Sequence, residues 1–222
     1  MRLYYGNIYA KSRQLINAGY ISLVKGDMLV IHGRNGSGKT LLIKDIQMNP
    51  QNVGYKIVLM DQNNALLIPT MDVLHNIAMS DEQERLNKAR QLIEFLGCGY
   101  LLQRRITKLS GGESRLVNFM RCVLSDADVL LIDEPTNDLD YSFVEKIIVV
   151  LKKIKAEKTI IVVSHDDRID SIATKSCEVK GNRLIYENEL TDIKEVLEEE
   201  PIKNVSMIAE LKNINLINDI EY

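Results

Sequence analysis

Residues 33–40 read GRNGSGKT and match the pattern G-x-x-x-x-G-K-[ST] at every fixed position. The apolar run Met28–Ile31 precedes this stretch and predicts a buried strand, while apolar residues at helical spacing follow it. Glycines let the backbone curl so that successive N–H groups point inward, and the N-terminus of the following helix adds a positive dipole. The stretch therefore predicts a loop that binds phosphate groups.

Two side chains in this loop carry distinct predicted roles. Lys39 is predicted to contact the β- and γ-phosphates of a nucleotide, and the Thr40 hydroxyl to bind Mg²⁺. The alternative, a glycine-rich turn that only joins a strand to a helix, is disfavoured by the Lys-Thr pair after a strand. The predicted nucleotide-binding positions here are Gly33, Asn35, Gly36, Ser37, Gly38, Lys39, Thr40 and Leu41.

The composition is that of a globular protein. Of 222 residues, 45% are hydrophobic and 27% charged, close to the average of about 45–50% and 25%. The formal net charge of −3 disfavours a generally basic nucleic-acid binder, so no nucleic acid is expected as a partner. No apolar run reaches the roughly 18–20 residues that cross a bilayer, and the N-terminus has no signal-peptide pattern. Three scattered cysteines favour a reduced, cytoplasmic protein.

The order of the apolar segments predicts the fold class. Four apolar runs predict strands of a mostly parallel sheet, and helical patterns lie between them, as in α/β proteins. These runs are Met28–Ile31, Ile57–Met60, Val129–Ile132 and Thr159–Val163.

Residues 176–186 predict a hairpin around Gly181-Asn182. Residues 66–109 show helical periodicity without a strand pattern, which predicts an inserted helical subdomain. Residues 181–222 carry ten acidic and four basic side chains, which predicts a separate acidic tail.

A second motif ends the third predicted strand. Residues 129–134 read VLLIDE, four apolar residues followed by two carboxylates. Asp133 is predicted to complete the Mg²⁺ site, because this cation prefers oxygen ligands. Glu134 is predicted to orient or deprotonate water beyond the γ-phosphate. Alone, the pattern is also that of a strand that exits into a polar turn.

Further motifs follow in the order of a known family. Residues 109–113 read LSGGE, residues 133–140 read DEPTNDLD, and residues 164–166 read SHD. Together with the phosphate-binding loop, they resemble the signature, Walker B, D-loop and switch histidine of ATP-binding cassette (ABC) ATPases. Gln62 lies where the Q-loop of that family falls. The resemblance covers about residues 1–187. It implies a P-loop (RecA-like) sheet flanked by helices, with a β-rich N-terminal edge and an inserted helical subdomain at about 66–120. The remainder, 188–222, is then an acidic, helical C-terminal tail.

The resemblance also implies roles for single residues. Two cassettes of the family face each other head to tail with two ATP molecules between them, so we expect a homodimer or a pair with a similar cassette. Ser110, Gly111 and Gly112 would then open a helix whose N-terminus meets the γ-phosphate held by the other chain. Glu134 and Lys39 would be catalytic. His165 would hold the γ-phosphate, and Gln62 would be a further catalytic residue that senses the γ-phosphate and the Mg²⁺. Asp138 and Asp140 would help to join one site to the opposite chain.

Tyr9 lies where the family often places an aromatic ring that stacks on adenine. A packed core or surface tyrosine is an equally good interpretation of this position.

This sequence also departs from the family pattern. Glu113 replaces the usual Gln, Arg115-Leu116 stand where Gln-Arg is common, and Leu41 stands where a second Ser or Thr is frequent. The interval between Lys39 and Gln62 is short, so the β-rich arm that usually fills it is expected to be trimmed.

The resemblance leaves two functions open. The first is the nucleotide-binding subunit of an ABC transporter, peripheral on the inner face of the cell membrane, that powers transport, with export favoured, through a separate permease. The second is a soluble ABC ATPase that acts in translation or another cytosolic assembly process, since Asn137-Asp138 resembles the D-loop of that subgroup. A catalytically inactive cassette is disfavoured because Lys39, Asp133, Glu134 and His165 are all present.

Overall fold

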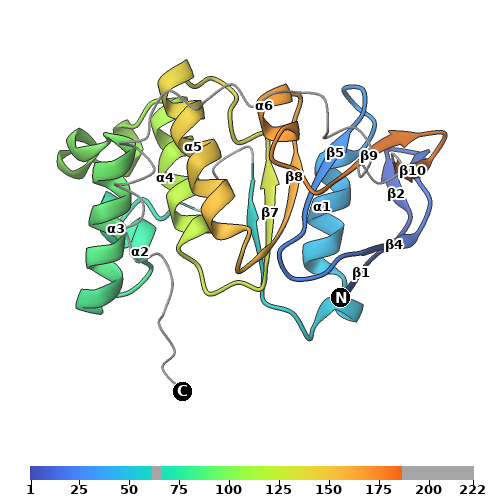
Figure 1. The fold of residues 1–222 in the computed structure, drawn as a ribbon, viewed down its shortest axis with the longest axis horizontal. Coiled ribbons are helices and arrows are strands. Elements are labelled where there is room, and N and C mark those ends of the chain that lie inside the picture. The colour runs from blue at the N-terminus through green and yellow to red at the C-terminus, as the bar shows by residue number, and fades with distance from the viewer. Residues whose placement is uncertain (62–66, 187–222) are drawn as a thin grey trace, which may run out of the picture. The chain divides into compact units, whose positions relative to one another are not determined.

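The structure is a computed structural model that describes residues 1–61 and 67–186 (Figure 1). The chain forms two compact units. The sheet unit contains residues 1–60, 126–135 and 155–186, and the helical unit contains the described residues of 61–125 together with 136–154. Each unit has its own secondary structure and is described separately below.

The sheet unit is built on a six-stranded sheet with the strand order β10-β9-β5-β8-β7-β6. Its strands are β5 (Met28–His32), β6 (Ile57–Met60), β7 (Val129–Asp133), β8 (Thr159–Val163), β9 (Lys175–Lys180) and β10 (Arg183–Tyr186). Neighbouring strands from β9 to β6 are parallel, and β10 pairs with β9 in the antiparallel sense. The four predicted parallel strands and the predicted hairpin are therefore confirmed.

Burial explains why β5, β7 and β8 read as continuous apolar runs. Every residue of β7 and β8 is buried, as are the first four of β5, so both faces of these strands require apolar side chains. In register, Ile31 of β5 and Asp133 of β7 both pair with Val163 of β8. The segments that follow these three strands consequently leave the sheet at the same edge.

Short antiparallel pairs form the N-terminal part of the sheet unit, as predicted. Strand β1 (Arg2–Tyr5) pairs with β4 (Gly19–Ser22), and β2 (Ile8–Ala10) pairs with β3 (Arg13–Ile16). Helix α1 (Lys39–Met48) buries its apolar face in the same core, and the short α6 (Asp167–Asp170) follows β8. Between α1 and β6 the chain forms one 3-10 turn, η1 (Pro50–Asn52), and no additional strand, so among described residues the trimmed arm is confirmed.

The helical unit contains α2 (Val73–Ala78), α3 (Gln83–Leu96), α4 (Gly111–Val123) and α5 (Tyr141–Ile154), with the 3-10 turns η2 (Gly99–Gln103) and η3 (Ile106–Lys108). Asp72 caps α2 by accepting a 2.8 Å hydrogen bond from the His75 N–H. The fully buried Asn76 satisfies the backbone before α2, because it accepts from the Ile68 N–H at 2.8 Å and donates to the Ile68 carbonyl at 3.0 Å. The predicted helices are present, while the subdomain limits of about 66–120 remain a prediction.

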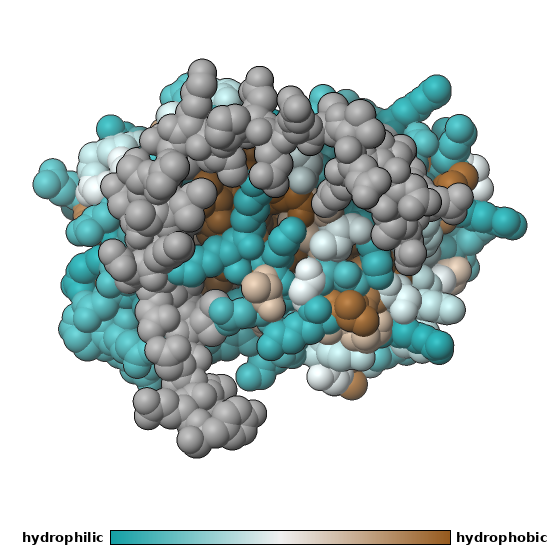
Figure 2. All heavy atoms as spheres, viewed as in Figure 1, coloured by the Kyte–Doolittle hydropathy of each residue, from teal (hydrophilic) through white to brown (hydrophobic). Residues whose placement is uncertain are grey.

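Two further sequence predictions lie outside the described residues. These are the position of Gln62 and the helical character of residues 188–222. Within the described ranges, no helix combines the length and hydrophobicity needed to span a membrane. On the face drawn in Figure 2, hydrophilic side chains predominate among the coloured residues.

Candidate active site

The stretch 33–40 forms a tight loop between β5 and α1. Gly36 and Gly38 have φ angles of 77° and 100°, in the left-handed region that favours glycine. Gly38 has a second constraint, because a Cβ atom there would lie 3.2 Å from the Leu15 Cβ. Helix α1 begins at Lys39, and no side chain caps its first N–H groups. The predicted architecture of strand, curled loop and helix N-terminus is therefore present.

Lys39 lies at the start of α1 and points back across the loop. Its Nζ donates hydrogen bonds to the Gly33 carbonyl at 2.6 Å and the Arg34 carbonyl at 3.3 Å. The side chain is buried, and burial lowers the pKa of Lys39, although Glu134 and Asp133 oppose the shift. The ammonium group is thus held inside the loop, where a phosphate oxygen could accept a hydrogen bond from it.

Asp133 and Glu134 follow each other at the end of β7 but differ in backbone conformation. Asp133 continues the strand and is 1% exposed. Glu134 has a φ angle of 50°, which turns the chain sharply, while its N–H still donates to the Val163 carbonyl at 2.9 Å. Such a left-handed conformation in a non-glycine residue costs about 1–3 kcal/mol and is typical of functional sites. The turn explains how two adjacent carboxylates take different positions.

Glu134 and His165 come together at this edge. His165 follows β8, and its Nε2 lies 3.6 Å from the Glu134 Oε1. The Glu134 side chain is 11% exposed and that of His165 is 50% exposed, so the imidazole lies on the solvent side of the pair. Burial raises the pKa of Glu134, and Asp133 adds to the rise, whereas His165 and Lys39 oppose it. A carboxylate with a raised pKa beside a histidine is suited to accepting a proton.

The donors near this edge fit Mg²⁺ bound with a nucleotide. Thr40 offers a hydroxyl and Asp133 a carboxylate, both hard oxygen ligands. Among the described residues, no group of three or more His, Cys, Asp or Glu could hold a metal by itself. The two oxygen donors suit Mg²⁺, which takes one or two protein ligands and fills its other positions with phosphate oxygens and water.

The predicted signature residues begin α4 in the helical unit. Ser110 is the N-cap of this helix, and its Oγ accepts a hydrogen bond from the Glu113 N–H at 3.2 Å. The Glu113 carboxylate in turn accepts from the Ser110 N–H at 2.8 Å and from Arg104 at 3.2 Å. Glu113, the departure from the family's usual Gln, therefore completes a capping box. Gly111 and Gly112 form the exposed and half-exposed first turn.

Asp138 lies in the same unit, after the turn that follows Glu134. It adopts a φ angle of 59°, and its carboxylate accepts a 2.9 Å hydrogen bond from Arg115 of α4. The structure therefore has the predicted site residues in two groups. The helical unit contains Ser110, Gly111, Gly112 and Asp138, and the sheet unit contains Lys39, Thr40, Asp133, Glu134 and His165.

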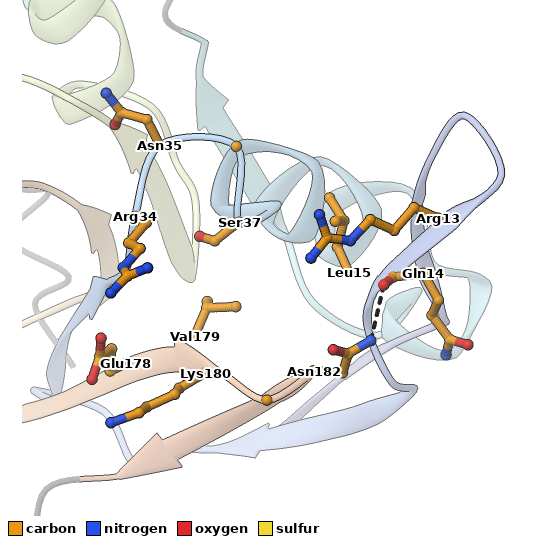
Figure 3. A pocket seen from close by; sticks show the side chains of 12 residues that line it. Arg13, Gln14, Leu15, Arg34, Asn35, Ser37, Glu178, Val179, Lys180 and Asn182 are labelled. Carbon is orange, nitrogen blue, oxygen red and sulfur yellow. Dashed lines mark hydrogen bonds between the residues drawn. The ribbon is translucent and has the colours of Figure 1, made fainter.

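A cavity of about 540 Å³ opens beside the phosphate-binding loop within the sheet unit (Figure 3). Residues 34–37 of the loop, residues 13–15 of β3 and residues 178–182 of the β9–β10 hairpin line it. Arg13, Arg34 and Lys180 give it three cationic side chains against one carboxylate, Glu178. Asn182 ties two walls together, since its Nδ2 donates to the Gln14 carbonyl at 2.9 Å (Figure 3). The cavity therefore favours an anionic or polar ligand.

The structure does not place Tyr9 in this cavity. Tyr9 lies on β2 and is 50% exposed. The sequence reasoning missed Arg13, Lys180 and Asn182, because residues so far apart in the chain share no local pattern. It also missed the capping box, although the S-x-x-E spacing at Ser110 and Glu113 signals one.

Comparison with known proteins assigns the family. Residues 17–137 match the profile of the ABC transporter family. The chain belongs to this family, and its fold is that of an ATP-binding cassette, the ATPase domain of ABC proteins.

The relatives of this chain include export proteins and an ATP-binding protein. The chain is 34% identical over 183 residues to the ATP-binding protein Uup of Buchnera aphidicola, covering 75% of this chain and 30% of that protein. It is 27% identical over 203 residues to the macrolide export ATP-binding/permease protein MacB of Aggregatibacter actinomycetemcomitans, covering 78% of this chain and 32% of that protein. The chain thus spans about a third of the length of these relatives.

Solved structures share the fold. A dimeric bacterial ABC transporter cassette superimposes with a TM-score of 0.72 at 21% identity, covering 86% of this chain and 99% of that one. A dimeric cassette in a post-hydrolysis state, bound to ADP and Pi, gives a TM-score of 0.71 at 20% identity, with the same coverage.

Proposed function

We propose that the chain binds and hydrolyses ATP as the nucleotide-binding component of an ABC transporter. The observation that carries this proposal is the meeting of loop 33–40, Asp133, Glu134 and His165 at one edge of the sheet. Each of these groups ends or follows one of the parallel strands β5, β7 and β8, whose ends are aligned by the register of the sheet. In open α/β sheets, ligands bind at the carboxyl ends of the strands.

Each residue at this edge has a defined role in the proposed reaction. The backbone N–H groups of residues 36–40 and the Lys39 ammonium bind the phosphates. Glu134 accepts a proton from a water molecule whose oxygen attacks the γ-phosphorus, and the bond to the bridging oxygen breaks to leave ADP and phosphate. His165 holds the γ-phosphate beside Glu134. Thr40 and Asp133 would hold Mg²⁺, which neutralises developing charge on the phosphate oxygens.

The proposed active form is a head-to-tail dimer. The N-terminus of α4 in one chain, at Ser110–Gly112, lies against the γ-phosphate bound by the other, since exposed N–H groups at a helix end attract anions. The dimeric state of the related cassette structures supports this arrangement. A similar cassette from another chain could take the place of the second copy. Gln62 is proposed to sense the γ-phosphate and Mg²⁺, as in the family.

The nucleoside end of ATP is proposed to occupy the cavity beside the loop. Its cationic and amide groups suit ribose hydroxyls and a purine face, because guanidinium groups stack on aromatic rings. Removing one such contact costs about 1 kcal/mol, so Arg13→Gln should raise the Kd for ATP about fivefold.

Calorimetry of ATP binding checks this expectation, with inorganic triphosphate as a second ligand. Arg13→Gln should leave triphosphate binding unchanged, and the exposed Lys11→Gln is the matched control. If Tyr9→Leu weakened ATP binding while Arg13→Gln did not, the nucleoside would be held by Tyr9 and the cavity assignment would be wrong.

The proposed partner is an integral membrane permease, which would hold the chain on the inner face of the cell membrane in the cytoplasm. The names of relatives such as MacB support a link to transport, and they favour export of a small molecule. The described residues contain no helix long and apolar enough to span a membrane, and in this proposal the membrane-spanning helices belong to the permease.

Cross-linking in intact cells tests this partner. A photoreactive residue in place of the half-buried Leu67 should capture a membrane protein, and the cross-linked product should sediment with the membrane fraction. The same residue in place of Lys25, an exposed position in the sheet unit, serves as the control. Capture of a ribosomal protein from a chain that stays in the cytosolic fraction would contradict the transporter proposal.

A second candidate is a soluble ABC ATPase that acts on a cytosolic assembly. Two observations favour it: the Asn137-Asp138 pair in the D-loop, and 34% identity to Uup, whose name is that of an ATP-binding protein. The cross-linking experiment separates the two candidates, because they differ in the class of the captured partner.

A further inference from the structure

Arg115 connects the two segments of the helical unit that carry the signature and the D-loop. It lies on α4, five residues after the N-cap Ser110. Its Nη1 donates a hydrogen bond to the Asn137 carbonyl and another, of 2.9 Å, to the Asp138 carboxylate. The Arg115 side chain is 7% exposed, whereas that of Asp138 is 80% exposed. The arginine is therefore the fixed, buried member of this contact.

The start of α4 also touches the D-loop directly. A Cβ atom added at Gly112 would lie 3.0 Å from the Asp138 carbonyl oxygen and 3.4 Å from the Leu139 Cδ2. Glycine at this position therefore allows the D-loop backbone to approach the first turn of the helix. At this approach Asp138 has a left-handed conformation, with a φ angle of 59°. A conformation that is unfavourable for a non-glycine residue persists only when neighbouring groups hold it.

These contacts indicate what Arg115 contributes. The Asn137 carbonyl and Asp138 carboxylate are bound by one guanidinium nitrogen, so the backbone and side chain of the D-loop are fixed to α4 together. Because Asp138 is largely exposed, water can replace its half of the contact. The bond to the Asn137 carbonyl thus positions the loop, and Arg115 stands where the family commonly has Gln.

We propose that Arg115 is a positioning residue that holds the signature helix and the D-loop as one rigid surface for the ATP-dependent dimer. The inference rests on the proposed function, since both segments would face the second chain. A preformed surface binds more tightly because less conformational freedom is lost on association. Loss of Arg115 should therefore weaken dimerisation without weakening ATP binding, which depends on the loop in the sheet unit.

The test uses Arg115→Met in a Glu134→Gln background, in which bound ATP should persist. Sedimentation with ATP and Mg²⁺ should show dimerisation about tenfold weaker than in the parent, while calorimetry gives an unchanged Kd for ATP. Arg115→Lys should recover part of the loss, and Asp138→Asn, which keeps the Asn137 bond, should have a smaller effect than Arg115→Met. The exposed Arg105→Gln is the control for charge.

Three results would overturn the inference. If Arg115→Met dimerised as well as the parent, Arg115 would have no positioning role. If Arg115→Met lost ATP affinity by as large a factor as it lost dimerisation, or unfolded at a much lower temperature, a general loss of structure would explain the change. A failure of Arg115→Lys to recover dimerisation would agree with that explanation. A parent that stays monomeric with ATP would instead contradict the proposed dimer itself.

Discussion

Glu134→Gln should reduce ATP turnover by about 10²–10⁴-fold, the usual contribution of a general base. The substitution keeps the size and burial of the side chain and removes only its ability to accept a proton. Glu134 Oε2 is buried and has no hydrogen-bond partner among the described residues, so replacing this oxygen breaks no hydrogen bond there. ATP binding should stay within about twofold of the unmodified chain, since the loop at 33–40 is unchanged. Phosphate release under saturating ATP measures the effect.

The matched control for this substitution is Glu157→Gln. Glu157 is an exposed carboxylate in the same unit, so its loss should leave turnover unchanged. Normal turnover in Glu134→Gln would show that another group activates water.

The pH dependence of turnover should also depend on the protonation of Glu134. Glu134 must be deprotonated to act as a base, and burial raises the pKa of Glu134 above its ordinary value. The rate should therefore fall, as the pH decreases, at a higher pH than an exposed carboxylate would give. This acidic limb should be absent from the residual activity of Glu134→Gln.

Lys39→Met should weaken ATP binding by about 100-fold, because two charge-assisted hydrogen bonds contribute roughly 1.5 kcal/mol each. Methionine keeps an apolar stem of similar length and removes the ammonium group. Lys39 also braces the loop through the Gly33 and Arg34 carbonyls, so part of the loss reflects loop geometry. Titration with ATP and Mg²⁺ by calorimetry measures the change.

The control for Lys39→Met is Lys56→Ala, an exposed lysine of the same unit. Thermal unfolding of both variants reports whether the loop change destabilises the fold. A folded Lys39→Met that bound ATP with the original affinity would remove Lys39 from the phosphate site.

The sheet and its ligand-binding edge could be predicted because their signals are local. Strands β7 and β8 are buried on both faces, so each appears in the sequence as an uninterrupted apolar run. The loop at 33–40 is defined by glycines whose backbone conformations other residues rarely adopt. The parallel order of the strands then determines that Lys39, Glu134 and His165 approach the same edge.

Other parts of the site depend on contacts between distant residues. Arg13 and Lys180 line one cavity because β3 and the β9–β10 hairpin lie side by side, which no single segment reveals. The bond between Arg115 and Asp138 spans 23 residues and depends on a left-handed turn at an aspartate. The sequence showed that Arg115 was unusual for the family, but the geometry explains what it contacts.

A single-turnover experiment tests the central claim, that Glu134 acts in cleavage of bound ATP, most directly. The chain is held in excess over ATP labelled at the γ-phosphate, and the mixture is quenched at successive times. The unmodified chain should convert bound ATP to ADP and phosphate, whereas Glu134→Gln should retain almost all of it uncleaved for at least about 100 times longer. Cleavage of bound ATP by Glu134→Gln at the rate of the unmodified chain would contradict the account.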